Sequence, residues 1–515
     1  MDDDMELKKN GSPHGAMEQT VSIQQAPIQQ APNVEKRFRL WSTLALQCSI
    51  SATPLAIGTY LATDIGIGGS PVYFFGYVLC GIMNVVICAS LSEIAAVLPH
   101  PTGQIYWAAV LYPPKYARGV SYLLGWLTCG AWFCAAAATY LFTAQLTMAL
   151  VSVIRTNFVA LPWHVYMAYI GVAAFAFCLN LPLFKLYPYL LNGLVPFINI
   201  GTIFVMIGLL VRAHPKQSAS FVFADFVNET GWKSDGVVFF LGLLPGVGAT
   251  IGFDAATHMT EELPDAKRQV PRIIMYSVLI NVLVGLPMTL VYSFCTVSPE
   301  NLLTPIGGQP IIQILLDGMD SLALTIIGSL IFLITFMFGA TTVSTVFSRT
   351  WWSFAQAGGV PFSGFFAKIN ARLHLPVNSI VLGTLGGMAI GAIEIGSTTA
   401  LNAIAGATVA TFYASYTIPI VGLLINRRAI FAQTRYFNMG KWGLVVNVIA
   451  VAWMSMMFVW VCVPLYLPVE LITMNWSSVV VVGVLFIGVV NWVVIGRKTF
   501  TNPAMVTDGV QLHTV

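Results

Sequence analysis

Charged residues are scarce in this chain of 515 residues. Asp, Glu, Lys and Arg together make up 9% of the sequence, whereas hydrophobic types make up 57%. A soluble domain carries roughly 25% charged residues, so this chain lacks the polar side chains that would keep an ordinary surface hydrated. The composition therefore excludes a string of soluble domains, although the length alone would allow several.

Several chemical signatures are missing as well. The sequence has no GxxxxGK[ST] loop for nucleotide phosphates, and its seven histidines are scattered without metal-site spacing. All eight cysteines fall in apolar runs, so they offer no disulfide framework. We therefore expect neither an enzyme nor an ATP-driven pump, and we expect no cofactor, no metal site and no nucleic-acid partner.

Long stretches without any charge are abundant. Each is at least 18 residues long, and a helix that spans the lipid core needs about 20 apolar residues. Because backbone groups in lipid must be satisfied within the segment, these stretches are expected to be helices. The sequence predicts an all-α polytopic membrane protein with about twelve transmembrane helices, at residues 40–63, 65–92, 119–154, 156–184, 186–211, 236–253, 273–299, 321–348, 373–393, 395–426, 442–469 and 471–496.

The basic residues are distributed unevenly between the connecting segments. If the N-terminus is cytoplasmic and all twelve stretches cross, 20 Lys and Arg residues lie on the cytoplasmic side and 4 on the outer side. This bias follows the positive-inside rule. Both termini are therefore predicted to be cytoplasmic, and the glycosylation sequons at Asn228 and Asn475 are predicted to face outward.

Two of the predicted helices contain an interruption. The first carries the sequence SISATP at 49–54, and the sixth carries PGVGATIG at 245–252. We expect Thr53 to cap a second half-helix with Pro54 at its first position. Spans one and six correspond in a five-plus-five inverted repeat, and paired broken helices are a sequence pointer to a transporter's binding site. The alternative is that the two interruptions are proline kinks without a role in function.

A block around the sixth span resembles a known family. Residues 252–262 (GFDAATHMTEE), followed by Asp265-Ala266 and Pro271, are similar to the sixth-helix signature of the fungal amino acid/choline/GABA permeases. These belong to the amino acid–polyamine–organocation superfamily. The segment 220–226 (SFVFADF), with Asn228 and Gly231-Trp232, resembles the same family. So do shorter motifs in spans two and three, namely Ser92-Glu93-Ile94, Pro99, Gly103-Gln104, Trp107, Tyr122 and Gly125-Trp126.

The resemblance covers residues 40–495 and implies a leucine-transporter-like fold, with ten core helices in two inverted halves plus two more. It also implies uptake of amino acids, choline or related amines, usually coupled to protons. The sequence departs from the family at 102–107 (TGQIYW), where a double glycine is usual, and at 355–358 (AQAG). The second departure removes an Arg/Asp pair that the family often carries after helix eight.

The three parts of the chain follow from these observations. Residues 1–38 are expected to be a disordered cytoplasmic tail, residues 39–496 a twelve-helix transporter domain, and residues 497–515 a second cytoplasmic tail.

The candidate solute-contacting residues come from the two interruptions and from helix three. Unpaired backbone groups at the breaks would hold a carboxylate or an amine, and aromatic faces would contact an ammonium group. Phe253 is interpreted as an aromatic gate, with core packing as the alternative. The residues are Ser51, Ala52, Thr53, Pro54, Trp132, Phe133, Gly248, Ala249, Thr250, Gly252 and Phe253.

Charges at membrane depth are costly and therefore informative. Asp254 follows the second interruption, where it would either cap the inner half-helix or line the gate, or else act as a counter-charge or proton carrier for coupling. Glu93 is a second coupling or gating candidate, with an ion pair to a loop Arg or Lys as the alternative. Asp64 and Glu394 are expected to be solvated or paired at the surface.

Hydroxyl groups in helix eight leave a further alternative open. Thr341, Thr342 and Ser344 would supply oxygens to a sodium ion, or they would only bond back to their own helix.

Together these patterns predict a secondary active transporter that moves a small amine-bearing solute by alternating access. The family resemblance implies that protons drive it. The plasma membrane is the expected location, with a vacuolar or other internal membrane as the alternative. Rival functions are export or vacuolar storage of a fungal specialised metabolite, a channel, and a nutrient receptor that does not transport.

The charge bias makes the topology testable. Reporter domains fused before residue 1 and after residue 515 should both be active only in the cytoplasm, because 20 of the 24 basic residues would otherwise face outward. A reporter inserted in the loop 212–235 serves as the outward-facing control. A terminal reporter found outside would contradict the assignment.

Overall fold

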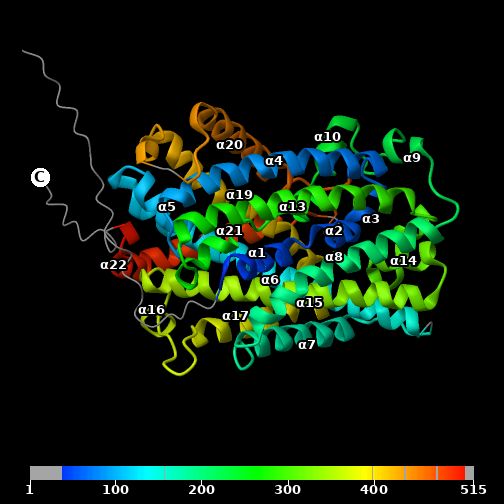
Figure 1. Cartoon of the computed structure of the whole chain (residues 1–515), viewed down its shortest axis with the longest axis horizontal. Coiled ribbons are helices and arrows are strands. Elements are labelled where there is room, and N and C mark those ends of the chain that lie inside the picture. The colour runs from blue at the N-terminus through cyan, green and yellow to red at the C-terminus, as the bar shows by residue number, and fades with distance from the viewer. Residues whose placement is uncertain (1–37, 156, 397, 434–435, 471–473, 505–515) are drawn as a thin grey trace, which may run out of the picture.

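The computed structural model describes residues 38–155, 157–396, 398–433, 436–470 and 474–504, and within these ranges the protein is helical. One isolated backbone bridge in the described part joins Ile67 to Asn228. Figure 1 shows the long helices running roughly parallel along one axis, as expected of a bundle that crosses a membrane.

Eleven helical segments among the described residues are long and apolar enough to cross a membrane. They are the broken segment Leu40–Ile65, α4 (Gly69–Val97), α6 (Pro114–Ile154), α7 (Pro162–Asn180), α8 (Tyr187–Arg212), α13 (Ala266–Phe294), α15 (Leu322–Gln356), Val377–Gly396 with α17 (Val377–Gly391) and α18 (Ile393–Gly396), α19 (Thr398–Ile425), α20 (Gly443–Trp460) with the preceding turn, and Ser477–Thr499 with α21 (Ser477–Asn491) and α22 (Arg497–Thr499).

The remaining predicted span is the interrupted sixth. It consists of α10 (Asp235–Leu241), α11 (Leu244–Gly248) and, after an unwound stretch, α12 (Ala255–His258). Shorter helices lie between the spans: α5 (Gln104–Leu111), α9 (Ala219–Phe223), α14 (Pro310–Met319) and α16 (Ser363–Phe366). The all-α polytopic fold predicted from the charge-free stretches is confirmed.

The outer surface of the bundle is apolar. Large aliphatic side chains stand exposed on the peripheral helices, for example Ile200 on α8, Leu283 on α13 and Val482 on α21. In water such a surface would drive aggregation, whereas in a bilayer it contacts the acyl chains. The first span lies innermost, with 78% of its most apolar window buried, against 22% for the last span.

The helices pair as an inverted repeat requires. The second span, α4, packs along the seventh, α13, and the third, α6, packs along the eighth, α15. Spans one and six are both broken, and their unwound segments are hydrogen-bonded to each other, as described below. The leucine-transporter-like arrangement thus places both breaks at the centre of the bundle.

Both ends of the described chain pack on the bundle, beyond the boundaries predicted for the two tails. Residues 1–37 of the N-terminal tail lie outside the described residues, but Phe38 is fully buried and packs against Phe184. Of the C-terminal tail, residues 497–504 are described, and residues 505–515 lie outside the described residues. The segment after residue 497 is held because Phe500 inserts into an apolar cluster.

The docked C-terminal segment is held by one arginine and one aromatic cluster. The Arg118 guanidinium donates to the carbonyl oxygens of Arg497 (2.7 Å) and Phe500 (2.9 Å). The Phe500 ring is 2% exposed and lies 5.2 Å from the Tyr122 ring and 5.9 Å from the Phe354 ring, measured between centroids. The segment that follows the last span is therefore packed against the helix bundle.

Phe500→Ala should lower the free energy of unfolding by about 3 kcal/mol, because it empties a closely packed aromatic site. Thermal unfolding in detergent measures this. Phe365→Ala, at a half-exposed position on α16, is the control and should have little effect. Equal stability of wild type and Phe500→Ala would mean that the segment does not dock.

Candidate functional site

The first span breaks at Ala52. Its backbone adopts the left-handed region (φ 38°, ψ 38°), and its N–H donates to the carbonyl of Cys48, which ends α1 (Leu40–Ser51). The short helix α2 (Thr53–Ala56) starts immediately, with Pro54 in its first turn. The prediction that Thr53 caps this half-helix is wrong: its hydroxyl donates instead to the Ala249 carbonyl of the sixth span, at 2.8 Å.

The sixth span breaks later than expected. Pro245 sits in the first turn of α11, where a proline needs no N–H partner, and only the two-residue turn 242–243 separates α11 from α10. The unwound stretch is 249–254 instead. Gly252 has φ +91°, and a Cβ there would lie 3.0 Å from Ile50, so this close approach to the first span favours glycine.

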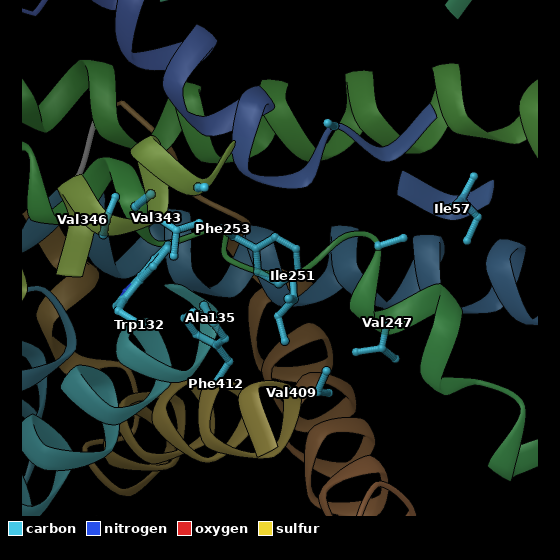
Figure 2. Close-up of a cluster of buried hydrophobic side chains, with 14 of the residues drawn as sticks. Ile57, Trp132, Ala135, Val247, Ile251, Phe253, Val343, Val346, Val409 and Phe412 are labelled. Atoms are coloured by element: carbon cyan, nitrogen blue, oxygen red, sulfur yellow. The ribbon is translucent and has the colours of Figure 1, made fainter. Parts of the chain in front are cut away.

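Side chains tie the two unwound segments together. Besides the Thr53 bond, the Gln47 amide donates to the Gly252 carbonyl at 2.5 Å, and the Ser51 hydroxyl donates to the Ile251 carbonyl at 3.4 Å. These bonds satisfy carbonyls that the broken helix leaves without partners. Figure 2 shows Ile251 and Phe253 along this stretch, beside Trp132 and Phe412.

A cavity of ≈ 110 Å³ lies at the two breaks. Five predicted solute-contacting residues line it, namely Ser51, Ala52, Trp132, Gly248 and Gly252. Ser49, Ile50 and Ile251 also line it, and they belong to the interruptions whose backbone carbonyls were expected to hold an amine. The other lining residues were not anticipated from the sequence. They are Ala56, Tyr60, Ala135, Ala138, Thr139, Phe142, Thr335, Phe336, Gly339, Val343, Ala405, Thr408, Val409 and Phe412.

The other predicted solute-contacting residues lie outside this lining. Phe133 packs on Phe347 of α15, with ring centroids 5.4 Å apart. Phe253 is 2% exposed and lies 5.7 Å from the Tyr416 ring of α19. The Thr250 hydroxyl accepts from the Asn84 amide and donates to the Gly246 carbonyl.

Thr53 and Ala249 are hydrogen-bonded to each other, as described above. Pro54 lines a different groove, on the lipid side, between α1, α8 and α13. These residues therefore lie behind the cavity lining rather than in it. A sequence pattern finds the break, but it does not tell which face of each half-helix points inward.

The cavity wall carries hydroxyls and aromatic rings, and none of its lining residues in the described chain is Asp, Glu, Lys or Arg. One hydroxyl is unused: Thr335 Oγ1 on α15 is buried and has no hydrogen-bond partner within the described part of the chain. A buried polar atom without a partner costs about 1–3 kcal/mol, which a hydrogen bond to a bound solute would offset. The aromatic faces of Trp132 and Phe412 suit an ammonium group.

A second cavity, of ≈ 330 Å³, adjoins the first toward the end of the bundle that carries the loop 212–235. Both cavities are lined by Tyr60, Phe142 and Gly248. The Tyr60 and Phe142 rings meet edge to face, with centroids 6.0 Å apart. This pair therefore forms a wall between the central cavity and the second cavity, called the vestibule below.

Asp254 closes the cavity on its other side. Its carboxylate accepts hydrogen bonds from the Gln104 amide (2.6 Å), the Trp132 indole (3.2 Å) and the Tyr416 hydroxyl (2.6 Å). The capping interpretation is wrong, because the Asp254 side chain makes no bond to the N-terminal backbone of α12. The donors come from three other elements and draw the carboxylate away from its own helix.

The fourth contact of Asp254 is His258, which was not predicted from the sequence. Its Nε2 lies 3.0 Å from Asp254 Oδ2, and both side chains are 0% exposed. The signal that would have found it is the spacing: Asp and His four residues apart share one face of a helix.

In the eighth span, α15, the hydroxyls of Thr341, Thr342 and Ser344 donate to carbonyls of their own helix. This agrees with the alternative to a sodium site. Two of these hydroxyls also cross to other spans. Thr342 contacts the Ser49 hydroxyl (2.9 Å) and the Tyr187 hydroxyl (2.8 Å), and Ser344 contacts Tyr140 (2.6 Å). Across the described residues, no group of three His, Cys, Asp or Glu side chains could hold a metal ion.

Glu93 takes the ion-pair role. Its carboxylate lies 2.8 Å from Arg428 and accepts from the Met439 backbone N–H at 3.0 Å. The expectation that Asp64 and Glu394 are solvated is wrong, since both are buried. Asp64 is covered because the loop 227–229 closes over the end of the first span, with the Glu229 N–H donating to the Gly66 carbonyl.

The two sequons differ in accessibility. Asn228 is exposed. Asn475 is only partly exposed, and its amide donates to the carbonyls of Val461 and Val463. The third sequon residue is buried in both cases, as Thr230 and as Ser477. Asn228 thus stays a glycosylation candidate, and the geometry disfavours Asn475.

Comparison with known proteins agrees with this architecture. The family model for amino acid permeases matches residues 38–489. The chain belongs to the amino acid permease family. The permease thereby falls among membrane transporters rather than enzymes, as predicted from the sixth-helix block.

Three relatives illustrate the range of the family. A choline transporter from Saccharomyces cerevisiae is 27% identical over 469 residues, covering 91% of this chain and 83% of that protein. An amino-acid permease from Arabidopsis thaliana is 27% identical, covering 91% and 93%. A swainsonine transporter from Arthroderma benhamiae is 26% identical, covering 90% and 92%.

A further acidic cluster follows α12 in the permease, outside the spans. Glu262 pairs with Arg349 at the end of α15, at 3.2 Å, and its carbonyl accepts from the Phe38 N–H. Beside it, burial and then the charge of Glu262 raise the pKa of Glu261 to about 7. This ion pair bridges the sixth and eighth spans. The Arg/Asp pair that the family often carries after the eighth span is absent from this sequence.

The raised pKa of Glu261 makes stability depend on pH. The folded protein holds a proton that the unfolded chain releases above pH 4.5, so the free energy of unfolding falls as the pH rises from 4.5 to about 7. Glu261→Gln should therefore stabilise the permease at pH 8 by about 1–3 kcal/mol and change little at pH 4.5. Unfolding temperatures at both pH values measure this, with the exposed Glu300→Gln as control. A pH-independent effect would contradict the account.

Thr335→Val should raise the solute concentration that gives half-maximal uptake about 5- to 10-fold, because it removes one hydrogen bond to the solute. Stability should not fall, since the hydroxyl has no partner among the described residues to lose. Thr325→Val, on the same helix but bonded to the Leu315 carbonyl outside the cavity, should keep the affinity unchanged. An unaltered affinity in Thr335→Val would show that the solute binds elsewhere.

Proposed function

We propose that this permease is a proton-driven secondary transporter for a small amine-bearing solute, such as choline, GABA or an amino acid. The observation that carries the proposal is the cavity at the paired breaks of spans one and six. A solute bound there touches both inverted halves, so a rocking movement of one half against the other would expose it to either side in turn.

The lining favours a cation or zwitterion of modest size. The faces of Trp132 and Phe412 attract an ammonium group, at roughly 0.5–2 kcal/mol for each well-placed ring. The unused hydroxyl of Thr335 suits a carboxylate or hydroxyl at the other end of the solute. The choline transporter and the amino-acid permease among the relatives support solutes of this class.

The two ends of the cavity are proposed as gates. Tyr60 and Phe142 separate it from the vestibule. On the cytoplasmic side, Phe253, Asp254 and Tyr416 form the floor. Further toward the surface, Glu93 fixes the end of α4 through its ion pair with an arginine. We assign uptake across the plasma membrane, with the glycosylation candidate in the loop 212–235 on the outer face.

A second candidate is export or vacuolar storage of a specialised metabolite. The swainsonine transporter among the relatives favours it. Uptake and export use the same cavity but opposite gradients. Right-side-out and inside-out vesicles separate the two directions.

The test is uptake into proteoliposomes of radiolabelled choline, GABA and amino acids, with and without an inward proton gradient. We expect one solute class to be accumulated above equilibrium only when the gradient is present. Downhill flux that does not saturate would indicate a channel, and binding without flux would indicate a receptor.

Asp254→Asn should abolish accumulation driven by the proton gradient while solute exchange across the membrane continues, because the variant removes the negative charge beneath the cavity. Asn keeps the size of the side chain. Asn199→Ala, on the lipid side of α8, serves as the control and should accumulate the solute normally. Full accumulation in Asp254→Asn would exclude a coupling role.

A further inference from the structure

His258 has both ring nitrogens engaged at a fully buried position. Nδ1 lies 3.2 Å from the Pro101 carbonyl oxygen, in the connection between α4 and α5. Nε2 lies 3.0 Å from Asp254 Oδ2. The ring thus bridges the floor of the cavity and a loop on the cytoplasmic side.

The hydrogen bonds fix where the hydrogens are. A carbonyl oxygen can only accept, so Nδ1 carries a hydrogen. The Trp132 indole and the Gln104 amide can only donate to Asp254 through the nitrogens that face it, and the Tyr416 hydroxyl adds a third donor. A carboxyl group among three donors is in its ionised form. Nε2 must then carry a hydrogen as well, and the ring is an imidazolium.

We propose that His258 is the proton-binding site of the transport cycle, and that Asp254 stays ionised as its counter-charge. This inference rests on the proposed function, since it names the group through which protons are coupled. In the closed form the pair is neutral as a whole, so its burial at the centre of the bundle is tolerated.

The release step follows from the geometry. A Cβ at Gly103 would lie 3.1 Å from the His258 ring, so the loop that holds Pro101 is packed tightly against it. When this loop moves away, Nδ1 loses its acceptor and meets cytoplasmic water. The imidazolium then gives the Nδ1 proton to water. The neutral ring keeps the hydrogen on Nε2, which still donates to the Asp254 carboxylate.

Loss of the proton also has an energetic consequence. It leaves Asp254 as a buried charge without a positive partner, and breaking such a pair is strongly destabilising. A permease that has bound solute without this proton therefore does not close stably, which couples the proton to the solute. Trp132 connects this event to the solute, because it lines the cavity and donates to Asp254.

Few other titratable groups among the described residues face the pair. Tyr416 of α19 donates to Asp254, and Cys88 of α4 lies nearby, while α6 contributes Trp132 and α1 contributes Gln47, which carry no charge. Next to Pro101, burial lowers the pKa of His100 to about 4, so His100 is neutral at physiological pH. His258 is thus the cation available to Asp254 among its described contacts.

The test measures protons and solute together. Proteoliposomes that contain a pH-sensitive dye are given the transported solute without an imposed gradient. Wild type should acidify the lumen as the solute enters. His258→Gln, which is always neutral and can still donate to Asp254, should exchange solute without acidification. His164→Gln on α7, remote from the cavity, should behave as wild type.

A variant with an unpaired Asp254 risks misfolding, so a second variant keeps the test decisive. The double variant Asp254→Asn with His258→Gln carries no charge at either position and should exchange solute without acidification. Acidification by either variant at the wild-type ratio to solute would overturn the assignment of His258. If wild type itself does not acidify the lumen, the proposed proton coupling fails, and the inference falls with it.

Discussion

The structure depends on a negative charge buried at the centre of an apolar bundle. Asp254 lies where the sixth span is unwound, and its carboxylate is met by groups from α5, α6, α12 and α19. An unpaired charge there would take up much of the few kcal/mol by which a protein is stable. These four elements must therefore converge on one point, and this convergence closes the floor of the cavity.

The two broken helices depend on the same logic. An unwound backbone inside a membrane protein is tolerated only where other groups satisfy it or where it lines a cavity. Here Gln47 and Thr53 satisfy two carbonyls of the sixth span from the first. The breaks are therefore held by hydrogen-bonding side chains, and the cavity is the space between them.

Much of the fold was predictable because its cause is local. Charge-free stretches give the spans, and the proline and glycines near Ala52 and Gly252 give the breaks. The residues of the candidate site were harder to predict, because whether a residue lines the cavity depends on the direction of its side chain. Phe133 and Trp132 are neighbours in the sequence, yet Trp132 lines the cavity and Phe133 packs on a ring of α15. The remaining site residues, such as Thr335, became visible only when distant spans were brought together.

The central claim is that the solute binds between the two breaks, above Asp254. A cryo-electron microscopy map of the permease with its transported solute tests this most directly. The account predicts solute density in contact with Trp132 and within hydrogen-bond distance of the Thr335 hydroxyl, with the Asp254 network intact below it. Density confined to the vestibule beyond Tyr60, or to the lipid-side groove beside Pro54, would contradict it.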